Sequence, residues 1–256
     1  MKNIWDRLPN GRLLADVSLW SADLGALGQE VLRMDPYADL FHIDVADAHF
    51  VPSLLFFPDL VAAIRRFTTK PFHVHLMVDR PDMLVDGFIH AGADLVTLHL
   101  ENSYMEAGID AANSGGAQAG IAIQLDTDIS RLVQYLDKIQ IIVLMGTMLG
   151  IKGVSLDDRV LQKIGRVQRM ISENGQTGRI KISADGGIRM ETVPKLRQAG
   201  ADIVTPGSLI FKSQDLEQTI SWLRALWPVI TFPGNTVCLS QWRVCLHLER
   251  APLRFG

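Results

Sequence analysis

The chain has 256 residues, of which 48% are hydrophobic and 21% are charged, and its formal net charge at pH 7 is −3. This composition suits one globular domain, and the lack of a basic stripe argues against a nucleic-acid partner. No apolar run approaches the roughly 18 residues of a membrane span, the N-terminus lacks the apolar core of a signal peptide, and Cys238 and Cys245 match no zinc or disulfide framework, so we expect a cytoplasmic protein with no membrane partner.

Strand-like and helix-like segments alternate along the chain. Strands are predicted at the apolar runs 13–19, 39–45, 72–78, 95–100, 119–125, 140–145, 179–184 and 202–205. Helices are predicted at 21–34, 59–67, 80–91, 128–136, 156–173, 190–198 and 215–226. Continuous apolar runs such as 140–145 are typical of strands buried on both faces of a parallel sheet. The alternation predicts a (β/α)8 TIM barrel that forms a single domain over residues 1–226.

Residues 227–256 differ from the rest of the chain. Pro228, Pro233 and Pro252 interrupt any long element, although 237–239 and 244–248 have the apolar character of short strands. We interpret this segment as a C-terminal extension with no assigned role. Three possibilities stay open for residues 227–256: they pack under the barrel, they form a subunit contact, or they are disordered.

Ligand-type side chains occur where three of the predicted strands end. His42 and Asp44 occupy alternate positions of the second strand and so share one face. His75 lies on the third strand and Asp185 ends the seventh. The C-terminal ends of parallel barrel strands meet on one side of the barrel, and imidazole with carboxylate suits a divalent ion such as Zn²⁺, Fe²⁺ or Mn²⁺. The sequence therefore predicts one divalent ion per chain, held by these four residues.

Two glycine-containing turns follow the last two strands. Gly186 and Gly187 come after the seventh strand, and Gly207 and Ser208 come after the eighth. Glycines let backbone N–H groups approach an anion, and a short helix beginning near Ser208 would direct its positive end at the same place. This position in a barrel often binds phosphate, so we expect a phosphate site here.

Taken together, the motifs resemble the ribulose-phosphate 3-epimerase family from about residue 13 to about residue 226. The matching motifs are Ser18 within VSLWSADL, the His42 segment that ends in Phe50-Val51-Pro52, His75-Leu76-Met77-Val78, Ala-Gly-Ala-Asp at 91–94 and again at 199–202, Asp185-Gly186-Gly187-Ile188, and Gly207-Ser208. Each motif alone is weak. Their shared order and spacing make the resemblance specific.

The resemblance implies a metal-dependent 3-epimerase on a barrel of the ribulose-phosphate-binding type. The expected substrates are D-ribulose 5-phosphate and D-xylulose 5-phosphate, or a related pentulose or hexulose phosphate. Residues matching Asp44 and Asp185 are the two acid–base groups of the family, one on each face of a cis-enediolate, and also metal ligands. The implied substrate-binding residues are Ser18, His75, Met77, Met145, Gly150, Gly153, Gly186, Gly187, Gly207 and Ser208. Members of the family are usually homo-oligomers.

The sequence departs from the family pattern near the expected pocket. The loop 146–154 keeps Gly150 and Gly153 but lacks the usual Pro, Phe and one Gly. Within it, Lys152 either contacts the phosphate or is solvated. Ala46 stands where a Met is usual, and His73 where an acidic residue is usual. These changes leave the identity of the sugar open.

Other interpretations use the same barrel. A non-catalytic sugar-phosphate-binding barrel with a regulatory role is the main alternative. An orotidine-phosphate-type decarboxylase requires Asp-x-Lys-x-x-Asp on the second strand, and Ala46 occupies the position of that Lys. His49, His73 and His99 have no assigned catalytic role, and we interpret them as structural residues or as neighbours of the ligands.

Overall fold

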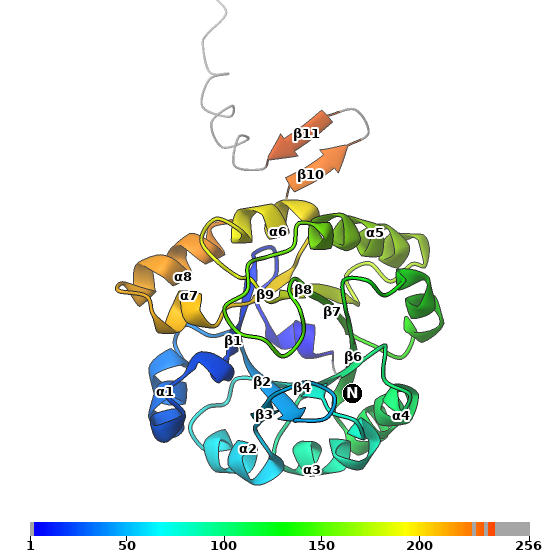
Figure 1. Cartoon of the computed structure of the whole chain (residues 1–256). Coiled ribbons are helices and arrows are strands. Elements are labelled where there is room, and N and C mark those ends of the chain that lie inside the picture. Colours follow the sequence, from blue (N-terminus) through cyan, green and yellow to red (C-terminus); the bar gives the residue numbers. More distant parts are fainter. Residues whose placement is uncertain (1–2, 227–228, 233–234, 239–256) are drawn as a thin grey trace, which may run out of the picture.

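The computed structural model describes residues 3–226, 229–232 and 235–238. A ring of parallel strands lies at its centre and helices surround it (Figure 1). The ring consists of β1 Leu14–Ser18, β2 Leu40–Asp47, β4 Phe72–Met77, β5 Leu95–His99, β6 Gln118–Ile123, β7 Ile141–Met145, β8 Lys181–Asp185 and β9 Ile203–Thr205. β1 pairs in parallel with both β2 and β9, which closes the ring. The predicted (β/α)8 barrel is confirmed.

Helices cover the outside of the barrel. They are α1 Leu27–Met34, α2 Pro58–Arg65, α3 Val85–His90, α4 Met105–Gly115, α5 Arg159–Glu173, α6 Val193–Ala199, α7 Ser208–Phe211 and α8 Leu216–Arg224. Short 3₁₀ helices occur at η1 Ile4–Arg7, η2 Leu19–Ser21, η3 Leu24–Ala26, η4 Pro81–Met83 and η5 Ile129–Tyr135. A two-residue strand, β3 Leu54–Leu55, pairs antiparallel with β2.

Three segments differ from the sequence-based prediction. The helix expected at 21–34 is α-helical only from residue 27, and the one expected at 128–136 is 3₁₀. Helix α4 was not predicted, because Gly108 and Gly115 have low helix propensity. Tertiary packing decides instead, since a Cβ on Gly108 would collide with Leu98 of β5. The glycine therefore lets α4 lie close against the barrel.

Strand β2 shows how the barrel separates its two faces. Phe41, Ile43 and Val45 are buried in the layer between the strands and the helices. His42 and Asp44 alternate with them and are also buried, so they point to the barrel interior. The sequence pattern had predicted this division, and it sets the direction of the candidate site.

The N-terminal segment closes the end of the barrel where the strands begin. Trp5 Nε1 donates to the carbonyl oxygens of Gln140 and Arg179, both at 3.1 Å, and these residues precede β7 and β8. The side chains of Ile4 and Trp5 are buried with residues from the barrel interior. This end is therefore filled with apolar side chains, and the opposite end remains for the polar residues.

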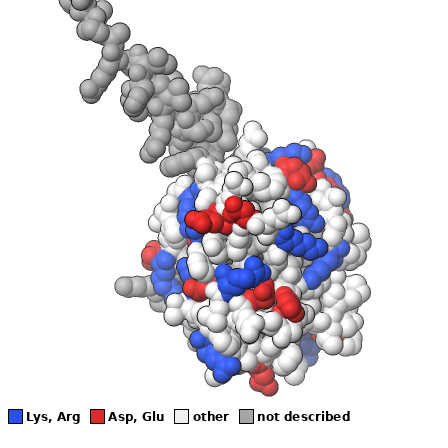
Figure 2. All heavy atoms as spheres, turned by 90° about the vertical axis from the view of Figure 1, so that its left-hand side faces the viewer, with Lys and Arg blue, Asp and Glu red and all other residues white. Residues whose placement is uncertain are grey.

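After the last helix, β10 Val229–Phe232 and β11 Asn235–Cys238 form an antiparallel pair. The strand expected at 237–239 overlaps β11, β10 was not expected, and the segment 244–248 lies outside the described residues. On the face of the molecule shown in Figure 2, acidic and basic side chains are interspersed. None of the helices within the described residues is long and apolar enough to cross a membrane.

Candidate active site

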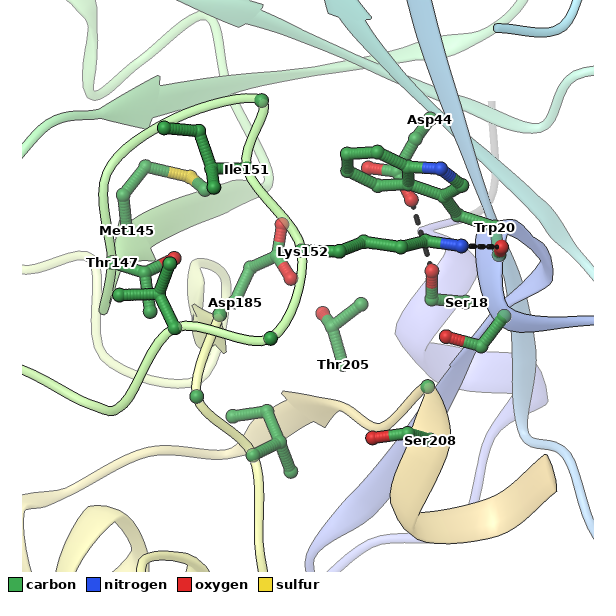
Figure 3. Close-up of a pocket in the computed structure, with 18 of the residues that line it drawn as sticks. Ser18, Trp20, Asp44, Met145, Thr147, Ile151, Lys152, Asp185, Thr205 and Ser208 are labelled. Carbon is green, nitrogen blue, oxygen red and sulfur yellow. Dashed lines mark hydrogen bonds between the residues drawn. The ribbon is translucent and has the colours of Figure 1, made fainter. Parts of the chain in front are cut away.

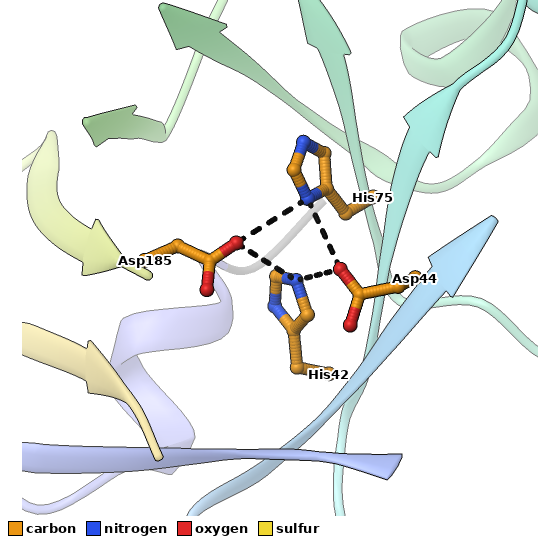
Figure 4. Close-up of side chains that lie close together, drawn as sticks. All are labelled: His42, Asp44, His75 and Asp185. Carbon is orange, nitrogen blue, oxygen red and sulfur yellow. Dashed lines mark hydrogen bonds and ion pairs between the residues drawn. The ribbon is translucent and has the colours of Figure 1, made fainter. Parts of the chain in front are cut away.

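Two histidines and two carboxylates converge at the C-terminal ends of three strands (Figure 4). Asp44 Oδ1 lies 3.2 Å from His42 Nε2 and 3.4 Å from His75 Nδ1. Asp185 Oδ2, from the other side of the cluster, lies 3.8 Å from His42 Nε2 and 3.6 Å from His75 Nδ1. The four residues predicted as ligands thus each direct one nitrogen or oxygen atom at a common point.

The chemistry of this cluster fits a divalent ion. The four atoms lie within 4.8 Å of one another, and both histidine side chains are fully buried. His75 Nδ1 is buried and makes no hydrogen bond to any described residue. A buried nitrogen without a partner is costly, and two imidazoles with two carboxylates are a common donor set for Zn²⁺, Fe²⁺ or Mn²⁺.

The two carboxylates have opposite proton affinities. Burial would raise the pKa of Asp44, but the charge of His42, the hydrogen bond between His42 and Asp44 and the nearby His75 outweigh burial and lower that pKa far below its usual value. Burial, with the charges of Asp44 and Asp16, raises the pKa of Asp185 to about 7. Near neutral pH the protein therefore keeps Asp44 ionised while Asp185 exchanges between its protonated and ionised forms, which allows one carboxyl to act as a base and the other as an acid.

His42 lies between two negative charges. Burial would lower its pKa, but the charges and hydrogen bonds of Asp44 and Asp16 raise the pKa well above the usual value. Ser18 Oγ donates to the other oxygen of Asp44 at 2.9 Å. Asp44 is therefore oriented by one neighbour on its own strand and one on β1.

A cavity of about 310 Å³ opens above the cluster. That volume suits a small ligand. Asp44 and Asp185 reach its wall (Figure 3). The predicted substrate-binding residues that line it are Ser18, Met77, Met145, Gly150, Gly153, Gly186, Gly187, Gly207 and Ser208. His42 and His75 do not line the cavity and lie beneath it, buried among the strands.

The glycines of the wall are required by geometry. Gly186 and Gly187 have φ angles of +90° and +70°, a region that side chains rarely adopt. A Cβ on Gly187 would also lie 2.6 Å from the backbone nitrogen of Leu156. A Cβ on Gly207 would collide with the side chain of Ser21. These turns therefore expose backbone at the cavity wall.

The loop 146–154 covers the cavity from one side. Ser53 Oγ donates to the carbonyl oxygen of Gly150 at 2.9 Å. Lys152 extends across the cavity and hydrogen-bonds the carbonyl oxygen of Trp20, with its ammonium 4.9 Å from the centre of the Trp20 ring (Figure 3). Lys152 lines the cavity and is also exposed to solvent, so its contact with a phosphate group stays a prediction.

Several lining and supporting residues were missed by the sequence analysis. Arg189 and Lys212 line the cavity together with Lys152. The sequence could have indicated both, because Arg189 follows the turn at Gly186 and Gly187, and Lys212 follows the turn at Gly207 and Ser208. Asp16 contacts His42 from behind, and Glu101 contacts His99, which in turn contacts His75. The signal for Asp16 was present, because it alternates with Ser18 on the inward face of the first strand.

Sequence comparison gives clear relatives. The profile described as "Ribulose-phosphate 3 epimerase family" matches residues 14–211. The chain is 35% identical over 209 residues to a ribulose-phosphate 3-epimerase of Bacillus subtilis, an alignment that covers 81% of this chain and 96% of the relative. It is 34% identical over 211 residues to the Escherichia coli K12 enzyme of the same name, covering 81% and 93%. A chloroplastic ribulose-5-phosphate-3-epimerase of Arabidopsis thaliana is 31% identical, covering 86% and 79%.

Solved structures with the same fold are more distant in sequence. A 3-keto-L-gulonate-6-phosphate decarboxylase of Vibrio cholerae superposes with a TM-score of 0.63 at 16% identity, covering 85% of this chain and all of the other. A protein named KGPDC, from Streptococcus mutans, superposes with a TM-score of 0.62 at 14% identity, covering 84% and 99%. At these identities the superpositions establish the barrel fold and nothing about the reaction.

Proposed function

The chain belongs to the ribulose-phosphate 3-epimerase family, and we propose that it interconverts D-ribulose 5-phosphate and D-xylulose 5-phosphate, or a related pair of pentulose or hexulose phosphates. Relatives that cover most of the chain carry the name of an epimerase, so the protein is an isomerase. The observation that carries the proposal is the meeting of Asp44 and Asp185, from β2 and β8, at the floor of one cavity.

Epimerisation at C3 removes a proton beside the carbonyl group and returns one to the opposite face. We assign the two transfers to Asp44 and Asp185, which enter the cluster from different sides. Asp44 is ionised and can therefore accept a proton, and the pKa of about 7 for Asp185 allows it to carry and release one near neutral pH. In the reverse direction the roles exchange. Ser18, which donates to Asp44, would keep that carboxylate oriented.

We assign the binding of a divalent ion to His42, Asp44, His75 and Asp185. The convergence of their donor atoms supports this assignment. When bound, such an ion supplies positive charge that stabilises the two oxygens of a cis-enediolate. The histidine side chains below it are fully buried, which shields the ion site from water on that side. Met77 and Met145 would contribute an apolar wall beside the carbon skeleton.

The phosphate group is assigned to the turns at Gly186, Gly187, Gly207 and Ser208, with Gly150 and Gly153 in the loop above. Three cationic side chains on the same cavity support an anionic substrate, namely Lys152, Arg189 and Lys212. Backbone N–H groups exposed by glycine and a positive local field together favour a dianion.

A substrate panel tests this function. Protein loaded with Zn²⁺, Fe²⁺ or Mn²⁺ is mixed in D₂O with pentulose and hexulose phosphates and with the unphosphorylated ketoses, and proton NMR follows loss of the C3 signal. We expect exchange and epimerisation with one phosphorylated pair and far slower reaction with free ketoses. Equal turnover of phosphorylated and unphosphorylated ketoses would refute the assignment of the phosphate site. Full activity in protein shown to be metal-free would refute the requirement for a divalent ion.

A further inference from the structure

Both histidines of the cluster are held from behind by a carboxylate. Asp16 on β1 accepts a hydrogen bond from His42 Nδ1, with 3.0 Å between Oδ2 and nitrogen. Glu101, just after β5, reaches His75 through His99: its Oε2 lies 3.2 Å from His99 Nδ1, and His99 Nε2 lies 2.8 Å from His75 Nε2. The side chains of Asp16 and all three histidines are fully buried.

We propose that Asp16 and Glu101 are positioning residues that set opposite tautomers on His42 and His75, so that each ring turns a lone pair toward the cluster. The proposal rests on the metal site of the proposed function and assigns a role to residues outside that site. Neutral imidazole has one N–H and one lone pair, and the partner of one nitrogen decides which is which. A carboxylate or other acceptor behind a ligand histidine fixes this choice.

A histidine that binds a metal ion must be neutral, and for neutral imidazoles the hydrogen-bond count leaves one consistent arrangement. An ionised Asp16 only accepts, so His42 carries its proton on Nδ1 and directs the Nε2 lone pair at Asp44 and Asp185. An ionised Glu101 only accepts, so His99 carries its proton on Nδ1 and offers the Nε2 lone pair. His75 must then donate from Nε2 to His99, which leaves its Nδ1 as a lone pair.

The unpartnered atom in the cluster agrees with this count. His75 Nδ1 makes no hydrogen bond to a described residue and points between Asp44 and Asp185. A lone pair has nothing to donate to those two oxygens, whereas it is a suitable ligand for a cation. His42 and His75 thus offer different ring nitrogens, Nε2 and Nδ1, and the difference follows from what lies behind each ring.

A second histidine shares the carboxylate of Asp16. His73 Nδ1 lies 2.6 Å from Asp16 Oδ2, and His73 Nε2 lies 2.6 Å from Thr97 Oγ1. Thr97 can donate its hydroxyl proton to Nε2, so His73 also carries its proton on Nδ1. His73 therefore helps to keep Asp16 in place through the same oxygen that accepts from His42, which gives a role to a histidine that stands where the family usually has an acid.

The direct test is nitrogen NMR on the full chain labelled with ¹⁵N-histidine and loaded with Zn²⁺. We expect the proton of His42 on Nδ1 and the proton of His75 on Nε2, assigned by comparison with His42→Gln and His75→Gln spectra. The same tautomer on both residues would overturn the proposal. A protein that binds no zinc would overturn the metal site and this inference with it, whereas zinc binding with other tautomers would overturn the inference alone.

Zinc affinity, measured by competition with a chromophoric chelator, separates positioning from general stability. Asp16→Ala and Glu101→Ala should raise the Kd about 10–100-fold. Asp16→Asn and Glu101→Gln retain an acceptor oxygen and should recover most of that loss. Asp202→Asn is the matched control, because Asp202 is a carboxylate that accepts from the Ile182 backbone at the start of β8, away from the cluster. An unchanged Kd in both alanine variants would contradict the proposal.

Discussion

At the scale of single residues, the account depends on where each proton lies. Asp44 and Asp185 occupy similar positions at strand ends, yet their pKa values shift in opposite directions. Burial alone would raise both values. The difference arises because Asp44 lies beside the charge of His42 and hydrogen-bonds His42 and Ser18, whereas Asp185 faces the negative charges of Asp44 and Asp16.

Glu101 predicts an acid dependence of stability. Burial would raise its pKa from 4.5, but hydrogen bonds from His99, Thr127 and the Gln124 backbone outweigh burial and lower it to about 2. A lowered carboxyl pKa stabilises the fold above the unfolded value of 4.5, and that contribution is lost as the pH falls through about 2. Thermal unfolding should therefore show Glu101→Gln less stable than the parent at pH 6, by a few degrees in Tm.

The gap between the two proteins should narrow steadily as the pH is lowered from about 4.5 toward 2. Glu106→Gln serves as the control, because Glu106 is an exposed carboxylate on α4. A difference in Tm that stays constant over this range would contradict the role given to Glu101.

At the scale of elements, turns and loops after the strands determine the shape of the cavity. The sequence predicted most strands within a few residues, because apolar runs and glycine turns are local signals. It missed α4, whose formation depends on packing against Leu98. It also missed the cationic side chains of Arg189 and Lys212 on the cavity wall, because only the closed barrel brings them together. The convergence of His42, Asp44, His75 and Asp185 was predictable because parallel strands all end on one side.

Gly207→Val tests the turn after β9. The new side chain would collide with Ser21 and enter the proposed phosphate site, so we expect KM for the phosphorylated substrate to rise at least about 10-fold, with a smaller change in kcat. Gly165→Ala on α5 is the matched control, since a Cβ there meets nothing within 4 Å. An unchanged KM in a folded Gly207→Val protein would show that the phosphate binds elsewhere.

Lys152→Met tests the loop. The substitution keeps the apolar length of the side chain and removes the charge that now contacts Trp20 across the cavity. If the ammonium exchanges the Trp20 carbonyl for the substrate phosphate, KM should rise about 5–30-fold, the equivalent of roughly 1–2 kcal/mol for one partly exposed charged contact. Lys195→Met removes an exposed lysine on α6 and should leave KM unchanged. A KM equal to the parent's in Lys152→Met would exclude Lys152 from phosphate binding.

At the scale of the whole molecule, the two ends of the barrel differ in the side chains that fill them. One end is filled by the N-terminal segment with Trp5, and the other carries the polar cluster and its cavity. We therefore expect residues at the filled end, such as Trp5, to contribute to stability without taking part in the reaction. This separation is typical of barrels, in which loops after the strands carry the reaction.

Trp5→Ala should lower stability and leave catalysis intact. The side chain is 4% exposed and its indole donates to two carbonyl oxygens, so its loss should cost about 3–5 kcal/mol of the free energy of unfolding. Urea unfolding measures the cost, and kcat per folded molecule should match the parent. Trp5→Phe should lose less, because it keeps a buried aromatic ring while it removes the hydrogen bonds and part of the indole volume. A strongly reduced kcat in folded Trp5→Ala would contradict the separation of the two ends.

The central claim is that Asp44 and Asp185 each transfer a proton on one face of the substrate. It is tested by deuterium exchange at C3 in D₂O with metal-replete Asp44→Asn and Asp185→Asn proteins, after their metal content has been measured. Each variant should exchange the C3 proton of one epimer only, and each should complete epimerisation at no more than about 10⁻² of the parent rate. Near-normal epimerisation by metal-replete Asp185→Asn would contradict the two-base account.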